Sequence, residues 1–130
     1  IVVIMNTLNK MKLKKKKKIN NFFSLKFKKS FDSLFSDGCY YKNKKIGLHY
    51  SKGNDNKYYI GYSIPKSKFP KAVERNLIKR RFRAQVNICS ELKKSHPGNF
   101  LFIYLDNEVP SSKNLSFEIT DIVKKLNQNT

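Results

Sequence analysis

Residues 71–83, KAVERNLIKRRFR, combine the apolar periodicity of a helix with six cations and a single acid. On a helical wheel, the polar side chains that fall within about 140° of one another are Arg75, Asn76, Lys79, Arg80 and Arg83. The apolar residues of the opposite half are Val73, Leu77, Ile78, Phe82, Ile88, Cys89 and Leu92. Arg81 falls among them, and we expect it to bury its stem and keep its head in water. The chain must therefore cover one side of this helix with a core and leave the other for solvent or a polyanion.

Proline and glycine set the limits of this helix. Pro70 suits the first turn, where a missing backbone N–H costs little. The helix is expected to continue to about Leu92, before His96, Pro97 and Gly98 break it. The sequence thus predicts one long helix between two breaker segments.

Four segments have the alternation or the apolar content of strands. A short strand is predicted at 39–41 and a buried one at 99–105, while residues 45–51 and 58–64 alternate apolar and small side chains. The polar loop between the last two predicts that they pair as a hairpin. Gly47 and Gly61 share the less apolar face with His49, which would let a ligand backbone approach closely.

Two further helices complete the pattern. Phe27, Phe31 and Phe35 recur every four residues between 25 and 35, and Asp37-Gly38 favours a stop there. Residues 115–126 carry apolar residues at helical spacing. The order is α-β-β-β-α-β-α, a single-domain α+β sandwich over residues 21–130, preceded by a basic arm over residues 1–20 that we expect to be disordered.

The charge balance favours a polyanionic partner. The chain has 28 Lys and Arg against 9 Asp and Glu, a net charge of +19, which opposes compaction. The arm adds seven lysines and no acid, either for non-specific phosphate contact or as a solvated tail. A nucleic acid, an anionic membrane surface and a solvated helix all remain open for the basic helix, although membrane docking would need exposed apolar groups beside the cations.

Residue types that carry catalysis are sparse. Cys39 and Cys89 have no ligand spacing and are expected to be reduced thiols, and His49 and His96 are too scattered for a metal site. A nuclease with its own two-metal centre would need several clustered acids, whereas most acids here are scattered among turns and the C-terminal third. The sequence predicts binding as the role of the protein, with no catalytic residue and no metal ligand of its own.

The segment AVERNLIKRRFR resembles the A-V-x-R-N-x-x-K-R-x-x-R signature of the protein subunit of bacterial ribonuclease P. The upstream GYSIPKSKFPK is similar to the G-x-S-x-x-K-K stretch of that family, one residue longer than its commonest form. Leu77 stands where the signature has its second arginine. The resemblance extends over roughly 25–126 and implies the family's ribosomal protein S5 domain 2-like fold, with a left-handed β-α-β crossover.

The resemblance also implies a function and two binding surfaces. In the family, the protein assists an endoribonuclease that removes the 5′ leader of precursor tRNA, while the RNA subunit holds the catalytic Mg²⁺ ions. The residues implied for the RNA subunit are Lys66, Lys68, Lys71, Arg75, Asn76 and Arg80. Those implied for the leader are Phe31, Phe35, His49, Lys79 and Arg83, with core packing as the alternative for the two phenylalanines.

The implied partners are ribonuclease P RNA and precursor tRNA, in the cytoplasm, without a membrane or an obligate protein partner. The main alternative is a ribosomal or other structured-RNA-binding protein without a processing role. That alternative explains the charge and the fold, but not the signature spacing together with the aromatic residues. A basic membrane-surface protein is the third hypothesis, and binding to anionic vesicles would test it.

Overall fold

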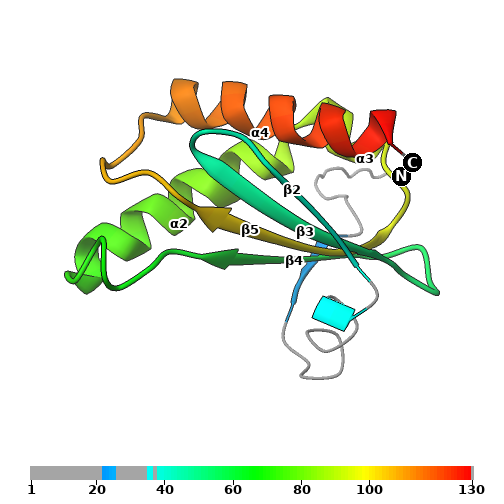
Figure 1. Ribbon diagram of the computed structural model, residues 1–130, viewed down its shortest axis with the longest axis horizontal. Coiled ribbons are helices and arrows are strands. Elements are labelled where there is room, and N and C mark those ends of the chain that lie inside the picture. Colours follow the sequence, from blue (N-terminus) through cyan, green and yellow to red (C-terminus); the bar gives the residue numbers. More distant parts are fainter. Residues whose placement is uncertain (1–21, 26–34, 37, 130) are drawn as a thin grey trace, which may run out of the picture.

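The computed structural model describes residues 22–25, 35–36 and 38–129, which form one five-stranded sheet and its helices (Figure 1). The elements are β1 (Phe22–Ser24), β2 (Cys39–Lys42), β3 (Ile46–Lys52), β4 (Tyr58–Ser63), α2 (Ala72–Asn87), α3 (Ser90–Lys93), β5 (Gly98–Tyr104) and α4 (Ser112–Gln128). The fold is the predicted α+β sandwich, with one strand more than the sequence indicated, because β1 lies upstream of the first predicted element.

The strands follow the order β1-β4-β5-β3-β2, which places β5 at the centre of the sheet. The predicted hairpin of 45–51 with 58–64 is wrong, because β3 and β4 each pair with β5 and not with each other. The loop between β3 and β4 is as short as a hairpin loop. It can still cross over the strand between them, because that requires only two inter-strand spacings, about 10 Å. The antiparallel hairpin is instead β2–β3, and the parallel neighbours β4 and β5 are joined through α2 and α3.

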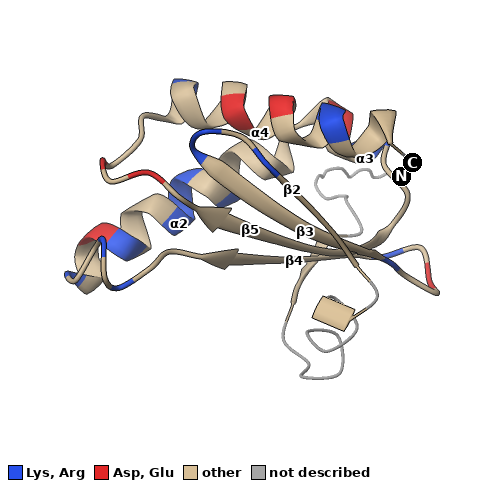
Figure 2. Ribbon diagram, viewed as in Figure 1, with Lys and Arg blue, Asp and Glu red and all other residues tan. Residues whose placement is uncertain are grey.

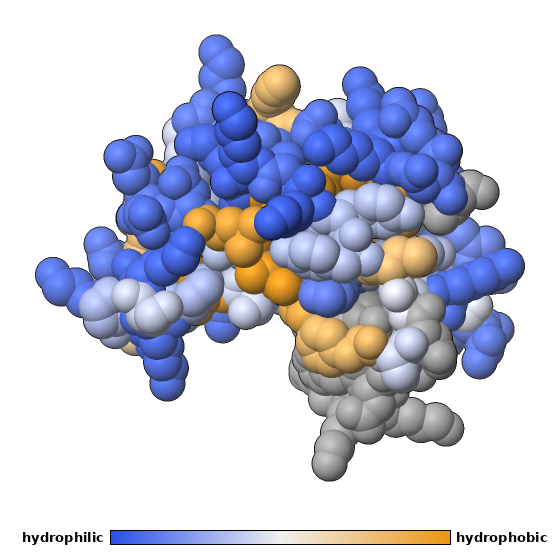
Figure 3. Space-filling model, viewed as in Figure 1, coloured by the Kyte–Doolittle hydropathy of each residue, from blue (hydrophilic) through white to orange (hydrophobic). Residues whose placement is uncertain are grey.

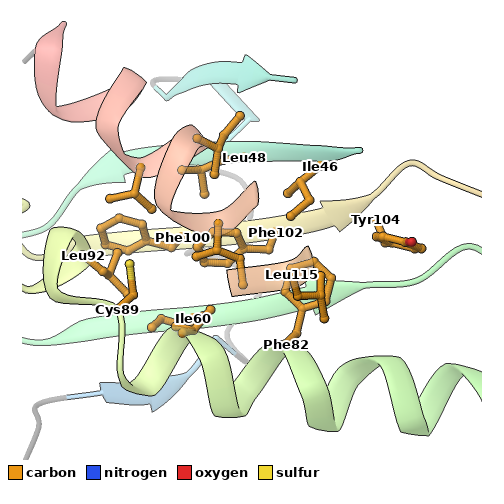
Figure 4. Packing of buried hydrophobic residues seen from close by; sticks show 14 of the residues in the cluster. Ile46, Leu48, Ile60, Phe82, Cys89, Leu92, Phe100, Phe102, Tyr104 and Leu115 are labelled. Carbon is orange, nitrogen blue, oxygen red and sulfur yellow. The ribbon is translucent and has the colours of Figure 1, made fainter. Parts of the chain in front are cut away.

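The hydrophobic core lies between one face of the sheet and the helices α2 and α4. Alternate residues of β5, Phe100, Phe102 and Tyr104, are fully or almost fully buried there, among side chains that project from the neighbouring strands and helices (Figure 4). α4 contributes the five apolar positions expected from the sequence, Leu115, Ile119, Ile122, Val123 and Leu126, all of them buried. Each buried side chain of this size contributes about 1.5–3 kcal/mol, so this layer fixes how α2 lies on the sheet.

Helix α2 is shorter than the sequence indicated. It begins after Lys71, so that Pro70 lies just outside the first turn, and a break at Ile88 and Cys89 separates α2 from α3. Ile78, Phe82, Cys89 and Leu92 are buried as expected. Val73 and Ile88 are 79% and 68% exposed, which corrects their assignment to the core side. Val73 lies in the first turn of α2, and Ile88 is its C-cap residue.

The opposite face of the sheet is only thinly covered by the residues described. Leu25 and Leu101 are buried there, with Tyr59 and Ile103 packed beside them. A side chain at Gly47 would collide with the Tyr40 hydroxyl, and one at Gly61 would press on Leu25 and Leu101. The space above Gly47 is therefore filled by Tyr40, so the expected close approach of a ligand backbone is wrong there. Gly61 still lines an open cleft, and the expectation for Gly61 stays a prediction.

Some predictions concern residues outside the described ranges. The basic arm, Phe31 and most of the helix predicted for 25–35 lie there, although residues 35 and 36 are helical. The stop at Asp37-Gly38 also falls partly outside. The predicted boundary between the basic arm and the folded domain, at residues 20 and 21, lies outside the described residues as well. All of these points remain predictions.

Candidate nucleic-acid interface

Helix α2 presents its cations on two sides. Arg75, Lys79 and Arg83 recur every four residues, and this stripe borders the sheet along β4. Asn76 and Arg80 are exposed on the outer side of the helix. Figure 2 shows blue bands along α2, whereas the most prominent red bands lie on α4. The helix therefore offers positive charge both towards the open edge of the sheet and towards solvent.

A cleft of ≈480 Å³ lies beside the stripe. It is lined by Leu25, Phe35, Gly61, Tyr62, Ser63, Ile64, Lys66, Arg75, Lys79 and Leu101. Two aromatic residues, three cations and the second half of β4 thus meet in one depression. Figure 3 shows the apolar surface over the strands bordered by hydrophilic side chains. A groove with a base-stacking surface and cations along its edge is suited to a single-stranded polyanion.

Arg75 also holds the loop that precedes α2. One guanidinium nitrogen donates hydrogen bonds to the carbonyl oxygens of Phe69 and Pro70, each with a donor–acceptor distance of 2.8 Å. Phe69 is buried in the core, so this contact fixes the loop that carries Lys66 onto the start of the helix. Arg75 is therefore both a lining residue of the cleft and a structural contact.

The other residues expected to face the RNA subunit have unequal surroundings. Lys66, Lys71, Asn76 and Arg80 are exposed. The Lys68 ammonium, although exposed, donates a hydrogen bond to the Leu105 carbonyl at the end of β5. The Arg81 guanidinium donates a hydrogen bond to the Pro110 carbonyl oxygen at 2.6 Å. The sequence predicted that this group would lie in water, whereas it is bound by the protein. Leu77, which replaces the second signature arginine, is half-buried.

Two aromatic rings, those of Phe35 and Tyr40, lie against His49, and of these Phe35 was expected from the sequence to bind the leader. The ring of Phe35 lies edge-on to His49 at 5.0 Å between centroids, and Tyr40 lies at 4.4 Å. Phe35 is 61% exposed and Tyr40 44%, so neither ring is simply a core residue. Burial lowers the pKa of His49 and favours its neutral form. The rings therefore offer an uncharged stacking surface on the open face.

Tyr40 and Tyr62 were not expected at this site from the sequence. Tyr40 is the register partner of His49 across β2–β3, so assigning that hairpin correctly would have placed the two rings together. Arg83 lies 5.8 Å from the ring centroid of Tyr62, which itself packs on Phe82 and Phe102. Burial raises the pKa of Tyr62. The alternation in β4 indicated the apolar role of Tyr62, but gave no signal for the arginine above it.

The described residues contain no group of three or more His, Cys, Asp or Glu placed to hold a metal ion. In the same part of the chain both cysteines are free thiols, Cys39 exposed and Cys89 buried. None of its helices is long and apolar enough to cross a membrane. The chemistry available at the cleft is therefore that of cations, aromatic rings and backbone.

These features define an α+β protein whose cationic helix borders an aromatic cleft on one sheet edge. A family model described as Ribonuclease P matches residues 19–127, so the chain belongs to the ribonuclease P protein family. Solved structures agree in fold. The ribonuclease P protein of Staphylococcus aureus superposes with a TM-score of 0.67 at 18% identity, over 80% of this chain and 94% of that one. The protein of Thermotoga maritima gives 0.66 at 18% identity, over 78% and 96%.

Curated relatives match over a shorter stretch. A ribonuclease P protein component of Phytoplasma australiense is 42% identical over 78 residues, which is 58% of this chain and 62% of the relative. One from Streptococcus pneumoniae is 36% identical over 61 residues, 47% of this chain and 49% of the relative. The matched segments thus span about half to three fifths of these relatives.

Proposed function

We propose that the chain is the protein subunit of ribonuclease P and assists the endonucleolytic removal of the 5′ leader from precursor tRNA. The observation that carries this proposal is the ≈480 Å³ cleft, whose lining joins Phe35 to the signature cations Arg75 and Lys79. Membership of the ribonuclease P family supports it. A general RNA binder would need the positive charge, but not an aromatic groove beside it.

In this proposal, the two sides of α2 have different partners. The exposed side chains Lys66, Lys71, Asn76 and Arg80 bind phosphates of the catalytic RNA, together with Lys68 and Arg75, which also hydrogen-bond to backbone carbonyls of the protein. The single-stranded leader is bound by Phe35 and Lys79 in the cleft, with His49 beside the Phe35 ring and Arg83 farther along α2, and Phe31 is assigned to it from the family resemblance alone. Stacking accepts any base, so the leader is held with little sequence preference.

The chain itself contributes binding, positioning and charge neutralisation. Cleavage is assigned to the RNA subunit together with its Mg²⁺ ions, which stabilise the reacting phosphate. This assignment is consistent with the lack of a metal-holding cluster in the described residues. The protein lowers the Mg²⁺ concentration that the RNA requires, because its cations neutralise phosphates that would otherwise repel one another. We assign this activity to the cytoplasm, where precursor tRNA is made in bacteria.

The test compares precursor tRNA with a 5′ leader and mature tRNA, each bound to a bacterial ribonuclease P RNA at low Mg²⁺ with and without the protein. Tighter binding of the leader-bearing tRNA alone, together with faster cleavage, is expected. Equal tightening of both RNAs without faster cleavage would instead identify a structured-RNA-binding protein without a processing role.

The variant Phe35→Ala tests the cleft directly. We expect it to weaken the binding of leader-bearing tRNA by about tenfold, the effect of one lost base stack, and to leave mature tRNA unaffected. Phe117→Ala is the matched control, because Phe117 on α4 is 64% exposed, close to the 61% of Phe35. Equal losses for both RNAs would show that Phe35 is structural.

A further inference from the structure

A second, smaller pocket lies farther along α2, between that helix and the edge strand β1. Its volume is ≈160 Å³, and its lining includes Phe22, Phe23, Tyr62, Arg83 and Asn87. Tyr62 also lines the larger cleft, so the two depressions share a wall. The leader-binding residues inferred from the signature include Arg83 but no residue of β1 and not Asn87.

The donors along this side of α2 form a continuous row. Arg75, Lys79, Arg83 and Asn87 follow at intervals of four residues, so one donor is presented at every turn over about 18 Å of helix. The first two line the larger cleft and the last two line the smaller pocket. An extended polyanion lying in the cleft would therefore meet further donors if it continued towards β1.

Strand β1 supplies aromatic surface at that end, and the loop before β4 supplies another cation. Phe23 is 47% exposed, and the Lys57 ammonium lies 5.3 Å from its ring centroid. Phe22, by contrast, packs against the ring of Tyr58 at 5.1 Å and joins the main core. The adjacent rings thus differ. Phe22 anchors β1, whereas the ring of Phe23 lies 5.9 Å from that of Tyr59 on the other side of the strand and remains about half exposed, with Lys57 beside it.

We propose that this pocket is a distal subsite for nucleotides of the single-stranded leader. Phe23 stacks on a base, while Lys57, Arg83 and Asn87 contact the backbone. This inference rests on the proposed function, which also sets the direction of the leader. Lys66 and Lys71, which are assigned to the catalytic RNA, lie just before α2, so the nucleotides nearest the cleavage site are placed at that end. Those farther from it reach Asn87 and β1.

The experiment measures binding of precursor tRNAs, whose leaders are lengthened one nucleotide at a time, to the holoenzyme reconstituted with a bacterial ribonuclease P RNA. We expect affinity to rise in two stages, first as the leader fills the cleft and again as it reaches the distal subsite. Asn87→Asp places a negative charge beside the phosphates. We expect this variant to lose the second stage, about tenfold, and to keep the first.

Two further variants separate local contact from general effects. Phe23→Leu keeps an apolar side chain on β1 but removes the aromatic face, and is expected to weaken only the second stage. Asn107→Asp is the matched control, because it makes the same charge change at an exposed asparagine of the loop after β5. Thermal unfolding of each variant shows whether the fold is kept.

The outcomes distinguish this inference from the proposed function. A first stage without a second, or a second stage unaffected by Asn87→Asp and Phe23→Leu, would overturn the distal subsite and leave the cleft assignment standing. No dependence on the leader at any length would overturn both. Loss of both stages in Asn87→Asp, with its fold intact, would also contradict a separate distal subsite.

Discussion

Arg75 and Arg80 have different surroundings, although both belong to the cationic signature of α2. Arg75 donates to two backbone carbonyls of the preceding loop, whereas Arg80 is exposed and no hydrogen bond to it is found within the described residues. The sequence placed both on one polar face, but could not separate a cation that holds a loop from one that faces a ligand. That distinction depends on where the loop lies.

The two arginines should therefore respond differently to removal. Arg80→Ala should lower RNA affinity and reduce the salt dependence of binding by about one phosphate contact, with the thermal midpoint unchanged. Arg75→Ala should also destabilise the fold by about 1 kcal/mol, because two carbonyls lose their donor. Calorimetry and a salt titration of RNA binding measure both effects. Equal thermal midpoints for the two variants would contradict the structural role of Arg75.

His49 makes stability depend on pH. Burial lowers its pKa in the folded state below the ordinary value of 6.5, so the unfolded chain binds more protons just below that pH. Its contribution is therefore fully present above pH 6.5 and is lost as the pH falls from there towards the folded pKa. Asp106, whose pKa is lowered by its bond with Lys45, titrates at more acidic pH, below 3.8.

Replacing His49 by phenylalanine tests this sign. Between about pH 8 and pH 5, urea unfolding should show wild-type stability falling relative to His49→Phe, which has no proton to bind. The added ring face should also improve leader binding at neutral pH, since Phe35 and Tyr40 already surround the position. Parallel stability curves for the two proteins would contradict the lowered pKa.

At the scale of elements, periodicity predicted α4 and the central strand well, because both are amphipathic or apolar along their whole length. Periodicity failed to predict which strands pair when the two strands are far apart in the sequence. The hairpin of β3 with β4 was wrong because β5, which comes later in the chain than both, lies between them and pairs with each. The uninterrupted apolar run of β5 was the available sign of a central strand covered on both faces.

Helix α2 begins with a weak cap. Lys71 occupies the N-cap position and makes no side-chain cap hydrogen bond, whereas Ser111 at the start of α4 accepts one from Asn114. Glu74 stands three residues after Lys71, the place of the acidic partner in a capping box. A lysine at this position therefore costs α2 a cap while it adds a cation to the surface assigned to RNA.

Lys71→Ser should consequently raise stability and lower RNA binding. Completing the capping box should add about 1 kcal/mol, or roughly 4 °C in the thermal midpoint. Loss of the cation should weaken binding to the catalytic RNA and reduce the salt slope by about one. Lys71→Ala is the control, since it removes the charge without adding a cap. Tighter RNA binding by Lys71→Ser would show that this lysine is not a phosphate contact.

At the scale of the whole molecule, the fold brings together what the sequence assigned to two surfaces. Lys66 and Arg75, inferred for the RNA subunit, line the same cleft as Phe35 and Lys79, inferred for the leader. The signature gave the residue types, but the shared cleft depends on β4 lying beside α2 at the sheet edge. Under the proposed function, two of the groups assigned to the leader and two of those assigned to the catalytic RNA therefore meet in one depression.

The net charge of +19 predicts opposite effects of salt on folding and on RNA binding. Between about 0.05 and 0.5 M NaCl, screening should weaken self-repulsion and raise the thermal midpoint by several degrees. Over the same range, RNA affinity should fall steeply, because binding releases counterions from the phosphates. Two ion pairs, Lys45–Asp106 and Lys94–Glu91, are found in the described residues, so screening has little attraction to remove. A midpoint that falls with NaCl would mean that attractive pairs outweigh repulsion. The excess charge would then be balanced within the protein and would not be available to a polyanion.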